Sequence, residues 1–146
     1  SVLTADGHGL IVDQSTGTTT LSGGTTSTTL TLNDSGARFS NSSGGPVRVT
    51  GVADGTSDYD AVNYRQLKKA YRGIASVAAM AAIPAPAPGK TFSLGLGYGY
   101  FEDKHAIAVG TKINIPTEST TAVTITGAWG YCDGDNTFNA GIGWSW

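Results

Sequence analysis

The C-terminal part of the chain alternates between large apolar and small residues with a period of two. Four segments share this alternation, namely 91–101, 105–115, 121–131 and 137–146. A period of two is typical of β-strands, because successive side chains point to opposite faces of a sheet. The large side chains on one face are Phe92, Leu94, Leu96, Tyr98, Tyr100, Ile107, Val109, Ile113, Ile115, Val123, Ile125, Trp129, Tyr131, Phe138, Ile142, Trp144 and Trp146. The pattern therefore predicts four strands in residues 91–146.

The opposite face of these segments consists mainly of small residues, and Lys112 is the one Lys, Arg, Asp or Glu within the four segments. A bulky uncharged face opposite a face rich in Gly and Ala is typical of a strand with lipid on one side and a closely packed lumen on the other. The segments also match the length of a tilted transmembrane strand, about 9–11 residues. Aromatic residues lie near the strand ends, as in interfacial girdles: Tyr98, Tyr100, Trp129, Tyr131, Trp144 and Trp146.

A helix is predicted over 60–83, with Asp60 as its N-cap and an end near Ala82. Apolar residues seven apart, with others three residues later, predict a narrow coiled-coil seam rather than a broad apolar stripe. The seam consists of Asn63, Leu67, Ala70, Ile74, Val77 and Ala81, and a polar residue such as Asn63 often sets the register. The alternative is an amphipathic helix that packs on a sheet of its own chain. Prolines at 84, 86 and 88 then predict a stiff connection over 84–90.

Residues 1–46 are rich in Gly, Ser and Thr and contain an internal repeat at an offset of 27. The identical pairs are Leu3 and Leu30, Thr4 and Thr31, Gly9 and Gly36, Ser15 and Ser42, and Gly17 and Gly44. Two copies at this period predict short strands in stacked layers, which need neighbours to bury apolar surface. The alternative is a disordered linker. Residues 47–59 are predicted to form a strand and then a turn, as a neck before the helix.

Composition and charge exclude several function classes. Only 14% of the 146 residues are charged, against about 25% in an ordinary soluble domain. The net charge of -2 gives no basic field for nucleic acid. The single cysteine, Cys132, excludes an internal disulfide, and no Cys/His cluster predicts a metal site. His8 and His105 have no acid partner at a fixed spacing, and no GxSxG motif occurs. We therefore expect no enzyme, no cofactor and no metal.

Four strands cannot close a barrel, and open strand edges are not tolerated in hydrocarbon. Three chains that share one barrel give twelve strands, an even number within the usual range. The predicted fold is thus a mainly β membrane protein, a homotrimeric 12-stranded transmembrane β-barrel with a short coiled-coil helix through the pore and a β-rich N-terminal segment. Lumen-facing glycines, Gly95, Gly97 and Gly99, would let the helices approach the wall. The small residues of the pore helix are Ala75, Ser76, Ala78, Ala79, Ala81 and Ala82.

The order of neck, Ala-rich helix and four strands resembles a known family. The neck VTGVADGTSDYDAVNYRQL spans 49–67, the helix end GIASVAAMAAIP spans 73–84, and the chain ends in an aromatic residue. This combination is similar to the C-terminal end of trimeric autotransporter adhesins, the YadA-like class of type V secretion in Gram-negative bacteria. The TLTLNDSGARFSN stretch at 29–41 also resembles passenger segments that precede such necks.

The resemblance implies three helices in a shared pore, through which the passenger leaves and stays attached as a surface fibre. It also implies that the barrel-assembly machinery reads the C-terminal residues Phe138, Ile142, Trp144 and Trp146. A C-terminus at the periplasm places the turns at 101–104 and 132–136 outside and the turn at 116–120 inside. We expect the chain to be the C-terminal part of a longer precursor.

The expected function is therefore an outer-membrane translocator and anchor, which exports its own passenger and tethers it at the bacterial surface for adhesion. The expected partners are two further copies of the chain, outer-membrane lipid, the barrel-assembly machinery and a host or surface receptor, with no nucleic acid. Two alternatives remain at this point. One is a passive trimeric porin, and the other is an anchor whose passenger acts on host actin.

Overall fold

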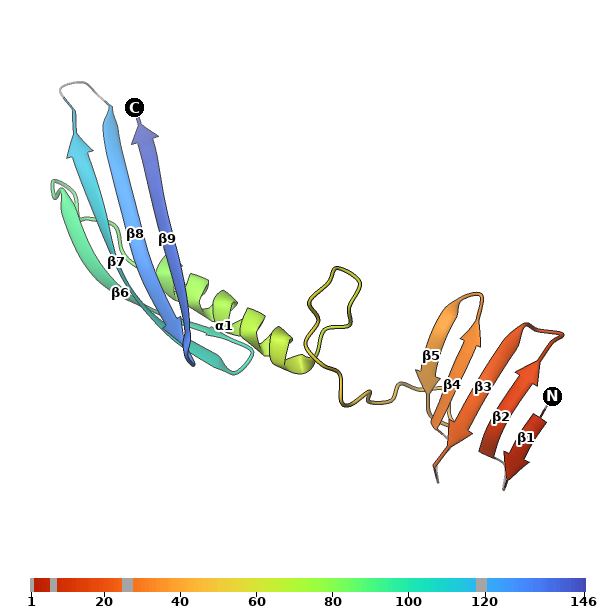
Figure 1. The fold of residues 1–146 in the computed structure, drawn as a ribbon. Coiled ribbons are helices and arrows are strands. Elements are labelled where there is room, and N and C mark those ends of the chain that lie inside the picture. The colour runs from red at the N-terminus through yellow and green to blue at the C-terminus, as the bar shows by residue number, and fades with distance from the viewer. Residues whose placement is uncertain (1, 6–7, 25–27, 118–120) are drawn as a thin grey trace. The chain divides into compact units, whose positions relative to one another are not determined.

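The computed structural model describes residues 2–5, 8–24, 28–117 and 121–146. These residues form two compact units, Ser1–Gly51 and Val52–Trp146 (Figure 1). The division lies five residues after the predicted end of the N-terminal segment at residue 46. Within the described part of the chain, no helix is both long and apolar enough to cross a membrane.

The N-terminal unit is a single antiparallel sheet whose strands follow one another in chain order. Its strands are β1 (Val2–Ala5), β2 (His8–Asp13), β3 (Thr18–Gly23), β4 (Thr28–Asn33) and β5 (Gly36–Ser40). The two copies of the sequence repeat are the hairpins β1–β2 and β4–β5, which β3 separates. The prediction of strands is confirmed, and within one chain they lie in one sheet, whereas packing of layers against neighbours stays a prediction. Short connections between the strands explain this, because they join neighbours within one sheet.

Equivalent glycines of the repeat share an unusual backbone conformation. Gly17 and Gly44 have φ angles of 63° and 76°, and Gly9 and Gly36 have φ angles of 147° and 112°. Residues with a Cβ rarely adopt such angles, whereas glycine does so at little cost. The repeat therefore preserves the backbone conformation at these two glycine positions as well as their identity.

The neck differs from its prediction, because residues 46–56 form no strand in the described structure. Pro46 has no N–H to donate to a strand ladder, and Gly51 has a φ of 77°, outside the extended region. Side chains from further along the chain hold this segment instead. The Gln66 side chain accepts from the Gly55 N–H at 3.0 Å and donates to the Gly55 carbonyl at 2.9 Å. The amide of Asn63 donates to the Val52 carbonyl at 3.1 Å.

Helix α1 (Tyr64–Ala81) begins three residues later than an N-cap at Asp60 predicts, because its N-cap is Asn63. The Asn63 Oδ1 accepts from the Gln66 N–H at 3.1 Å, and the Gln66 Oε1 accepts from the Asn63 N–H at 3.3 Å. These two bonds make a capping box. Asp60 instead accepts from the N–H groups of Thr56 and Ser57, which lowers the pKa of its carboxyl below 3.8.

The C-terminal unit contains a four-stranded antiparallel meander. Its strands are β6 (Phe92–Phe101), β7 (Lys104–Pro116), β8 (Ala122–Cys132) and β9 (Asp135–Ser145), and each end lies within two residues of its predicted position. Glu102, Asp103, Asp133 and Gly134 all have positive φ in the two tight hairpin turns, as two-residue turns require. The third predicted turn, at 116–120, lies partly outside the described residues.

The two faces of this sheet separate as the period of two predicts. One face packs against α1, and the buried apolar residues of the unit are Ala75, Ala79, Met80, Ile83, Ala106, Ala108 and Cys132. The other face holds large side chains that remain exposed, such as Leu96, which is 80% exposed. The core is therefore a thin layer of small residues between one helix and one sheet (Figure 1).

The capping box yields a prediction for Asn63→Ala. Loss of an N-cap costs about 1 kcal/mol, which corresponds to a roughly fivefold change in an equilibrium. We expect the Gln66 amide to exchange its hydrogen about fivefold faster in the assembled protein, as measured by hydrogen–deuterium exchange.

The Asn63→Ser variant is the control, since it keeps an acceptor for the cap and loses the amide that donates to Val52. Its Gln66 amide should exchange at a rate close to that of the native chain. Equal exchange rates in the native chain and in Asn63→Ala would show that Asn63 does not hold the helix start.

Candidate functional site

The contact between α1 and β6 is made by backbone against backbone. A Cβ on Gly97 would overlap the carbonyl of Ala79, and a Cβ on Gly99 would overlap the carbonyl of Ala75. At Gly95 a Cβ would lie 2.8 Å from the Cδ of Pro84. Glycine is therefore required at these three positions for the helix to lie so close to the sheet.

Two further glycines extend this contact onto the next strands, and they were not among the predicted site residues. Gly130 on β8 faces Ser76, with 3.2 Å between an added Cβ and the Ser76 carbonyl oxygen. Gly110 on β7 faces Ile83, with 2.7 Å to its Cδ1. Both belong to the small-residue face of the alternation, so parity places them on the correct face, but only the packing of the chain shows which groups they meet.

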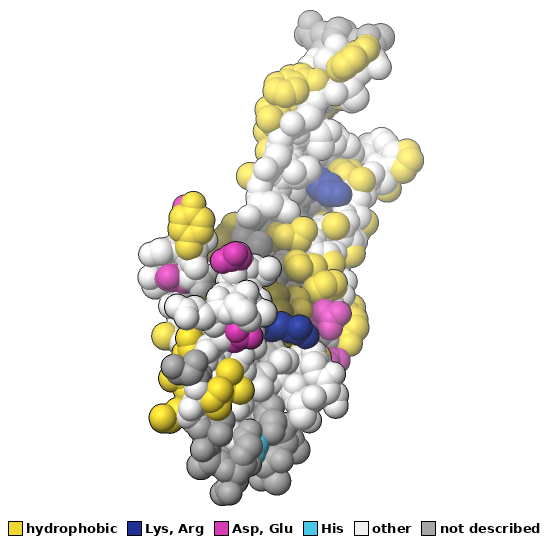
Figure 2. Space-filling view, turned by 90° about the vertical axis from the view of Figure 1, so that its right-hand side faces the viewer, with side chains coloured by type: hydrophobic (Ala, Val, Ile, Leu, Met, Phe, Trp, Pro, Cys, Tyr) yellow, Lys and Arg dark blue, Asp and Glu magenta, His cyan; other side chains and the backbone are white. Residues whose placement is uncertain are grey.

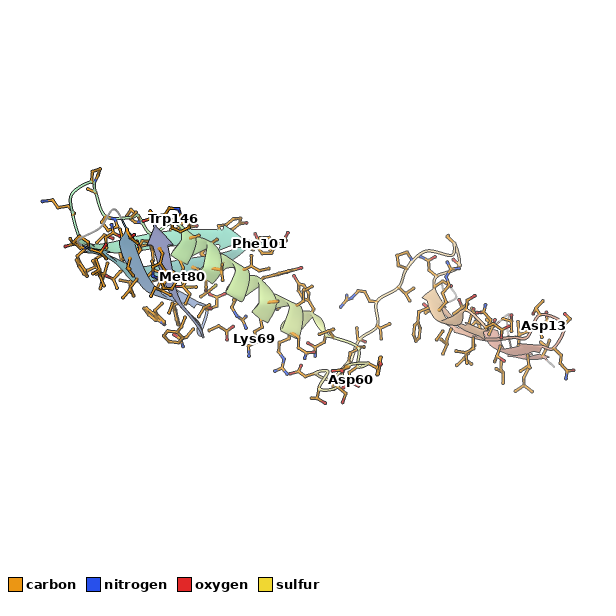
Figure 3. The ribbon with its side chains drawn as sticks, turned by 90° about the horizontal axis from the view of Figure 1, so that it is seen from above. Asp13, Asp60, Lys69, Met80, Phe101 and Trp146 are labelled. Atoms are coloured by element: carbon orange, nitrogen blue, oxygen red, sulfur yellow. The ribbon has the colours of Figure 1, made fainter. Side chains whose placement is uncertain are left out.

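The predicted small residues of the pore helix divide into two groups. Ala75, Ser76 and Ala79 are buried against the sheet, whereas Ala78, Ala81 and Ala82 are exposed in the single chain. The Ser76 Oγ is buried and has no hydrogen-bond partner among the described residues. Between Ala75 and Ala79, the face of α1 that meets the sheet therefore consists of small side chains, and Met80 is the long buried side chain near the end of the helix (Figure 3).

The predicted seam lies on the other side of the helix. Leu67, Ala70, Ile74, Val77 and Ala81 are all exposed in the single chain, and Val77 is 54% exposed. A hollow of about 540 Å³ lies beside Leu67 and Ala70. Asn63 is the exception, because it is the N-cap and its side chain is engaged with its own neck. Helix α1 thus packs on its own sheet through one face and presents an apolar seam on another.

Polar and aromatic contacts fix the level of the helix relative to the strands. The Arg72 Nε lies 2.5 Å from the Asp135 Oδ2 at the start of β9, and the Tyr71 ring meets the Phe101 ring edge-on at 5.5 Å. Arg72 is therefore level with the hairpin turns. Residues 64–70 project beyond these turns, as Figure 3 shows for the part of the helix that carries Lys69.

The other end of the helix is held at mid-sheet by Lys112, the one charged residue that was predicted within the strands. Its Nζ donates to the carbonyl of Ile83 at 2.9 Å. A cation is favourable at this end because the last carbonyls of a helix lack partners and carry a partial negative charge. Lys112 thereby donates a hydrogen bond to a backbone carbonyl that would otherwise lie in an apolar layer without this partner.

Between the two hairpin turns, Lys104 donates to the Asp133 carboxyl at 3.0 Å. This hydrogen bond lowers the pKa of the Asp133 carboxyl below 3.8. The turns therefore form a small charged rim at the end of the sheet from which the helix projects.

The outer face of the sheet is mainly apolar, with His105 and Asn136 as polar residues near the hairpin turns. The exposed large side chains on it include Phe92, Leu94, Leu96, Tyr98, Tyr100, Ile107, Ile113, Ile115, Ile125, Trp129, Tyr131, Phe138, Ile142, Trp144 and Trp146. Figure 2 presents another side of the molecule, on which exposed hydrophobic side chains lie beside scattered charged ones. The described residues contain no group of three or more His, Cys, Asp or Glu side chains placed to hold a metal ion.

Two family models match the chain in succession. The coiled stalk of trimeric autotransporter adhesins matches residues 48–82, and the YadA-like membrane anchor domain matches residues 84–146. Together they cover about two thirds of the chain. No curated protein matched the chain.

These matches agree with the geometry. The anchor domain forms a trimeric β-barrel with one helix from each chain, and four strands from each of three chains make twelve. The apolar outer face then meets lipid of the bacterial outer membrane, and the small-residue face encloses the helices. The family consists of adhesins and anchors and is not known for enzymes. The chain therefore belongs to the YadA-like trimeric autotransporter adhesins, of which it carries part of the stalk and the translocator that anchors the trimer in the outer membrane.

Proposed function

We propose that the barrel exports the segment before the stalk through its own lumen, and that α1 then remains in the lumen as the plug that tethers this segment at the cell surface. The observation that carries the proposal is the layer of glycine between α1 and its sheet. Three helices must share one lumen, and each takes the least radial space when only backbone separates it from the wall.

The direction of the helix supports surface exposure of residues 1–46. The start of α1 projects beyond the turns that contain Asp103 and Asp133, whereas Trp146 follows the opposite end of the sheet. In such barrels short turns and chain ends usually lie at the periplasm. In this chain the two-residue turns lie at the end of the sheet opposite the C-terminus, so both cannot face the periplasm. With the C-terminus at the periplasm, α1 leaves the barrel by the opposite end. The segments at 1–46 and 47–59 thus continue outward, and the connection at 84–90 returns at the periplasmic end.

The exposed seam supports a closed lumen after export. Leu67, Ile74 and Val77 lie on the side of α1 away from the sheet, where two other helices of the trimer can meet them. Ala78, Ala81 and Ala82 keep the helix narrow on this side. The same small residues allow a second segment of chain to pass during export, when each chain forms a transient hairpin in the lumen.

The first test places a large side chain in the helix–sheet contact. Gly97→Trp overlaps the Ala79 backbone, and overpacking costs about 1–3 kcal/mol even where neighbours can move. We expect a several-fold loss of surface display, measured as protease accessibility of an N-terminal epitope on intact cells, together with a loss of the trimer band on unboiled SDS gels.

The matched control is Leu96→Trp, which adds an aromatic side chain to the adjacent position on the lipid-facing side. Its display and its trimer band should equal those of the native chain. Normal display in Gly97→Trp would contradict the proposed contact.

The second test concerns the plug, and it uses Lys112→Met with Lys112→Arg as the control. Without the hydrogen bond from Lys112 to the Ile83 carbonyl, the C-terminal end of α1 loses the polar contact that holds it to the strands. In planar bilayers we expect the native trimer to stay closed and Lys112→Met to open often, with Lys112→Arg close to native because Arg also donates to carbonyls. A native trimer that conducts continuously would instead favour a passive porin.

A third test concerns recognition by the barrel-assembly machinery, for which we propose Phe138, Ile142, Trp144 and Trp146 as the signal. These four side chains project from one face of β9 and its end, and all are exposed. Trp146→Ala should reduce the trimer in cells but leave refolding of the purified chain in detergent unchanged, whereas Trp146→Phe should be normal in both. An equal loss in both assays would mean that Trp146 acts through stability and not through recognition.

A receptor for the passenger is the remaining partner that we propose, at the surface end of the fibre. The described residues of the N-terminal unit offer a polar sheet face for such contacts, with Thr20, Thr31 and Arg38 in one cross-strand row. The chemical class of this receptor, whether on a host cell or on an inert surface, follows from the passenger and not from the anchor.

A further inference from the structure

Arg38 is the single Lys or Arg in residues 1–46, and it lies on the polar face of the N-terminal sheet. Strand pairing places it opposite Thr31, whereas the neighbouring pair of Leu30 and Phe39 lies on the other face. The Arg38 side chain is exposed. Among the described residues it forms no ion pair, so its charge is available to a ligand.

A tight turn after β5 holds the guanidinium of Arg38 in place. The Arg38 Nη2 donates to the Gly44 carbonyl at 2.6 Å. Asn41 shapes this turn, because its Oδ1 accepts from the N–H groups of Ser43 at 3.0 Å and of Gly45 at 2.9 Å. The bond to Gly44 uses one of the five N–H donors of a guanidinium. The planar group is therefore oriented and still has donors for a ligand.

A hollow of about 390 Å³, which we call the Arg38 cleft, lies beside this side chain. Its polar lining residues are Thr31, Asn33, Ser35, Arg38 and Ser40. The Ser40 Oγ lies 2.8 Å from the Thr29 Oγ1, which fixes its position. Among the described residues that line the cleft there is no Asp or Glu and no large apolar side chain. The cleft thus combines one oriented cation with hydroxyl and amide groups.

This combination of groups fits an anionic saccharide. A guanidinium binds the oxygens of a planar or tetrahedral anion through two parallel hydrogen bonds. Hydroxyl and amide side chains both donate and accept hydrogen bonds, as the hydroxyl groups of a sugar require. A protein ligand usually inserts a large aromatic or aliphatic anchor into a pocket, and the Arg38 cleft offers no apolar pocket for one.

The first copy of the sequence repeat lacks this arrangement. At the offset of 27, Arg38 corresponds to Ile11. Both lie in one cross-strand row on the same face, connected through Thr20 and Thr31. The cation is therefore a feature of the second hairpin and not of the repeat as such. The row itself supplies control positions outside the cleft.

We propose that the Arg38 cleft binds an anionic saccharide, with the guanidinium of Arg38 on a carboxylate or sulfate group and the hydroxyl and amide groups of the cleft on sugar hydroxyls. The proposal rests on the proposed receptor contact of the N-terminal segment and names the chemical class of that receptor. The family matches at 48–82 and 84–146 do not extend to this cleft. A trimer carries three copies of the cleft, so a long saccharide chain would bind with avidity.

The test measures binding of labelled hexasaccharides to the purified trimer of the full chain in detergent. The probes are a heparin hexasaccharide with sulfate and carboxylate groups, a hyaluronan hexasaccharide with carboxylate groups alone, and neutral maltohexaose. We expect anionic probes to bind at least about tenfold more tightly than maltohexaose. Binding of the heparin probe alone would assign sulfate as the anion, and binding of both anionic probes would assign carboxylate.

Two variants of Arg38 test its role in this binding. Arg38→Ile, which introduces the residue of the first repeat copy, should weaken the anionic probe about tenfold. Arg38→Lys should weaken it only a few-fold, since Lys keeps the charge and loses the two parallel hydrogen bonds.

The matched control moves the cation along the same row and keeps the net charge of the chain. Ile11→Arg is combined with Arg38→Ile, and Val2→Arg with Arg38→Ile is a second such variant in case the first does not assemble. Ile11 is 38% exposed and Val2 is 66% exposed, so both positions accept a long side chain. Both double variants should bind the anionic probes as weakly as Arg38→Ile.

Three outcomes would overturn the proposal. The native trimer could bind neither anionic probe, or it could bind maltohexaose equally well. Alternatively, a double variant could regain native binding, which would show that binding follows net charge and not the cleft. The trimer band and surface display are measured for every variant, so loss of saccharide binding with both intact leaves the translocator function untouched.

Discussion

Hydrocarbon offers no hydrogen-bond partner, and this constraint governs the C-terminal unit. The meander β6–β9 has two edge strands, β6 and β9, whose outer sides pair with no further strand in the described part of the chain. In a bilayer each unpaired backbone N–H or C=O group costs several kcal/mol. The edges must therefore pair with other copies, and the trimer of the family supplies them. The sheet can therefore exist in the membrane only within a trimer, and the helix adds further contacts to this trimer.

Closure of the barrel then determines which residue types the inner face can contain. Three helices share the space that the twelve strands enclose, so the wall has to admit backbone contact. Gly97 and Gly99 provide it on β6, Gly130 provides it on β8, and Ala75 and Ala79 provide the matching surface on α1. Lys112 binds the Ile83 carbonyl in this layer, whereas the buried Ser76 Oγ has no hydrogen-bond partner among the described residues. The low charge of the chain follows from the same requirement, because few charges find a partner in such a layer.

Helix α1 combines two features that its sequence pattern offered as alternatives, an amphipathic helix on its own sheet and a coiled-coil seam. It packs on its own sheet, and it also presents a seam with a period of seven on the side away from the sheet. Different residues serve each face, with Ala75, Ser76 and Ala79 on one and Leu67, Ile74 and Val77 on the other. The N-cap Asn63 belongs to neither face, because its hydrogen bonds fold the neck back onto the helix start.

Local alternation was sufficient to determine the four strands, their faces and the tight hairpin turns, because the period of a strand and the φ angles of a turn are set by neighbouring residues. The need for a trimer also followed from the sequence, since four apolar strands cannot close. Three features depended on tertiary structure: the choice of Asn63 over Asp60 as the N-cap, the inclusion of Gly110 and Gly130 in the helix contact, and the union of both repeats in one sheet. Each depends on which distant groups meet, such as Asn63 with Val52 or Gly130 with Ser76. Spacing along the chain does not contain that information, because it arises only when the chain has packed.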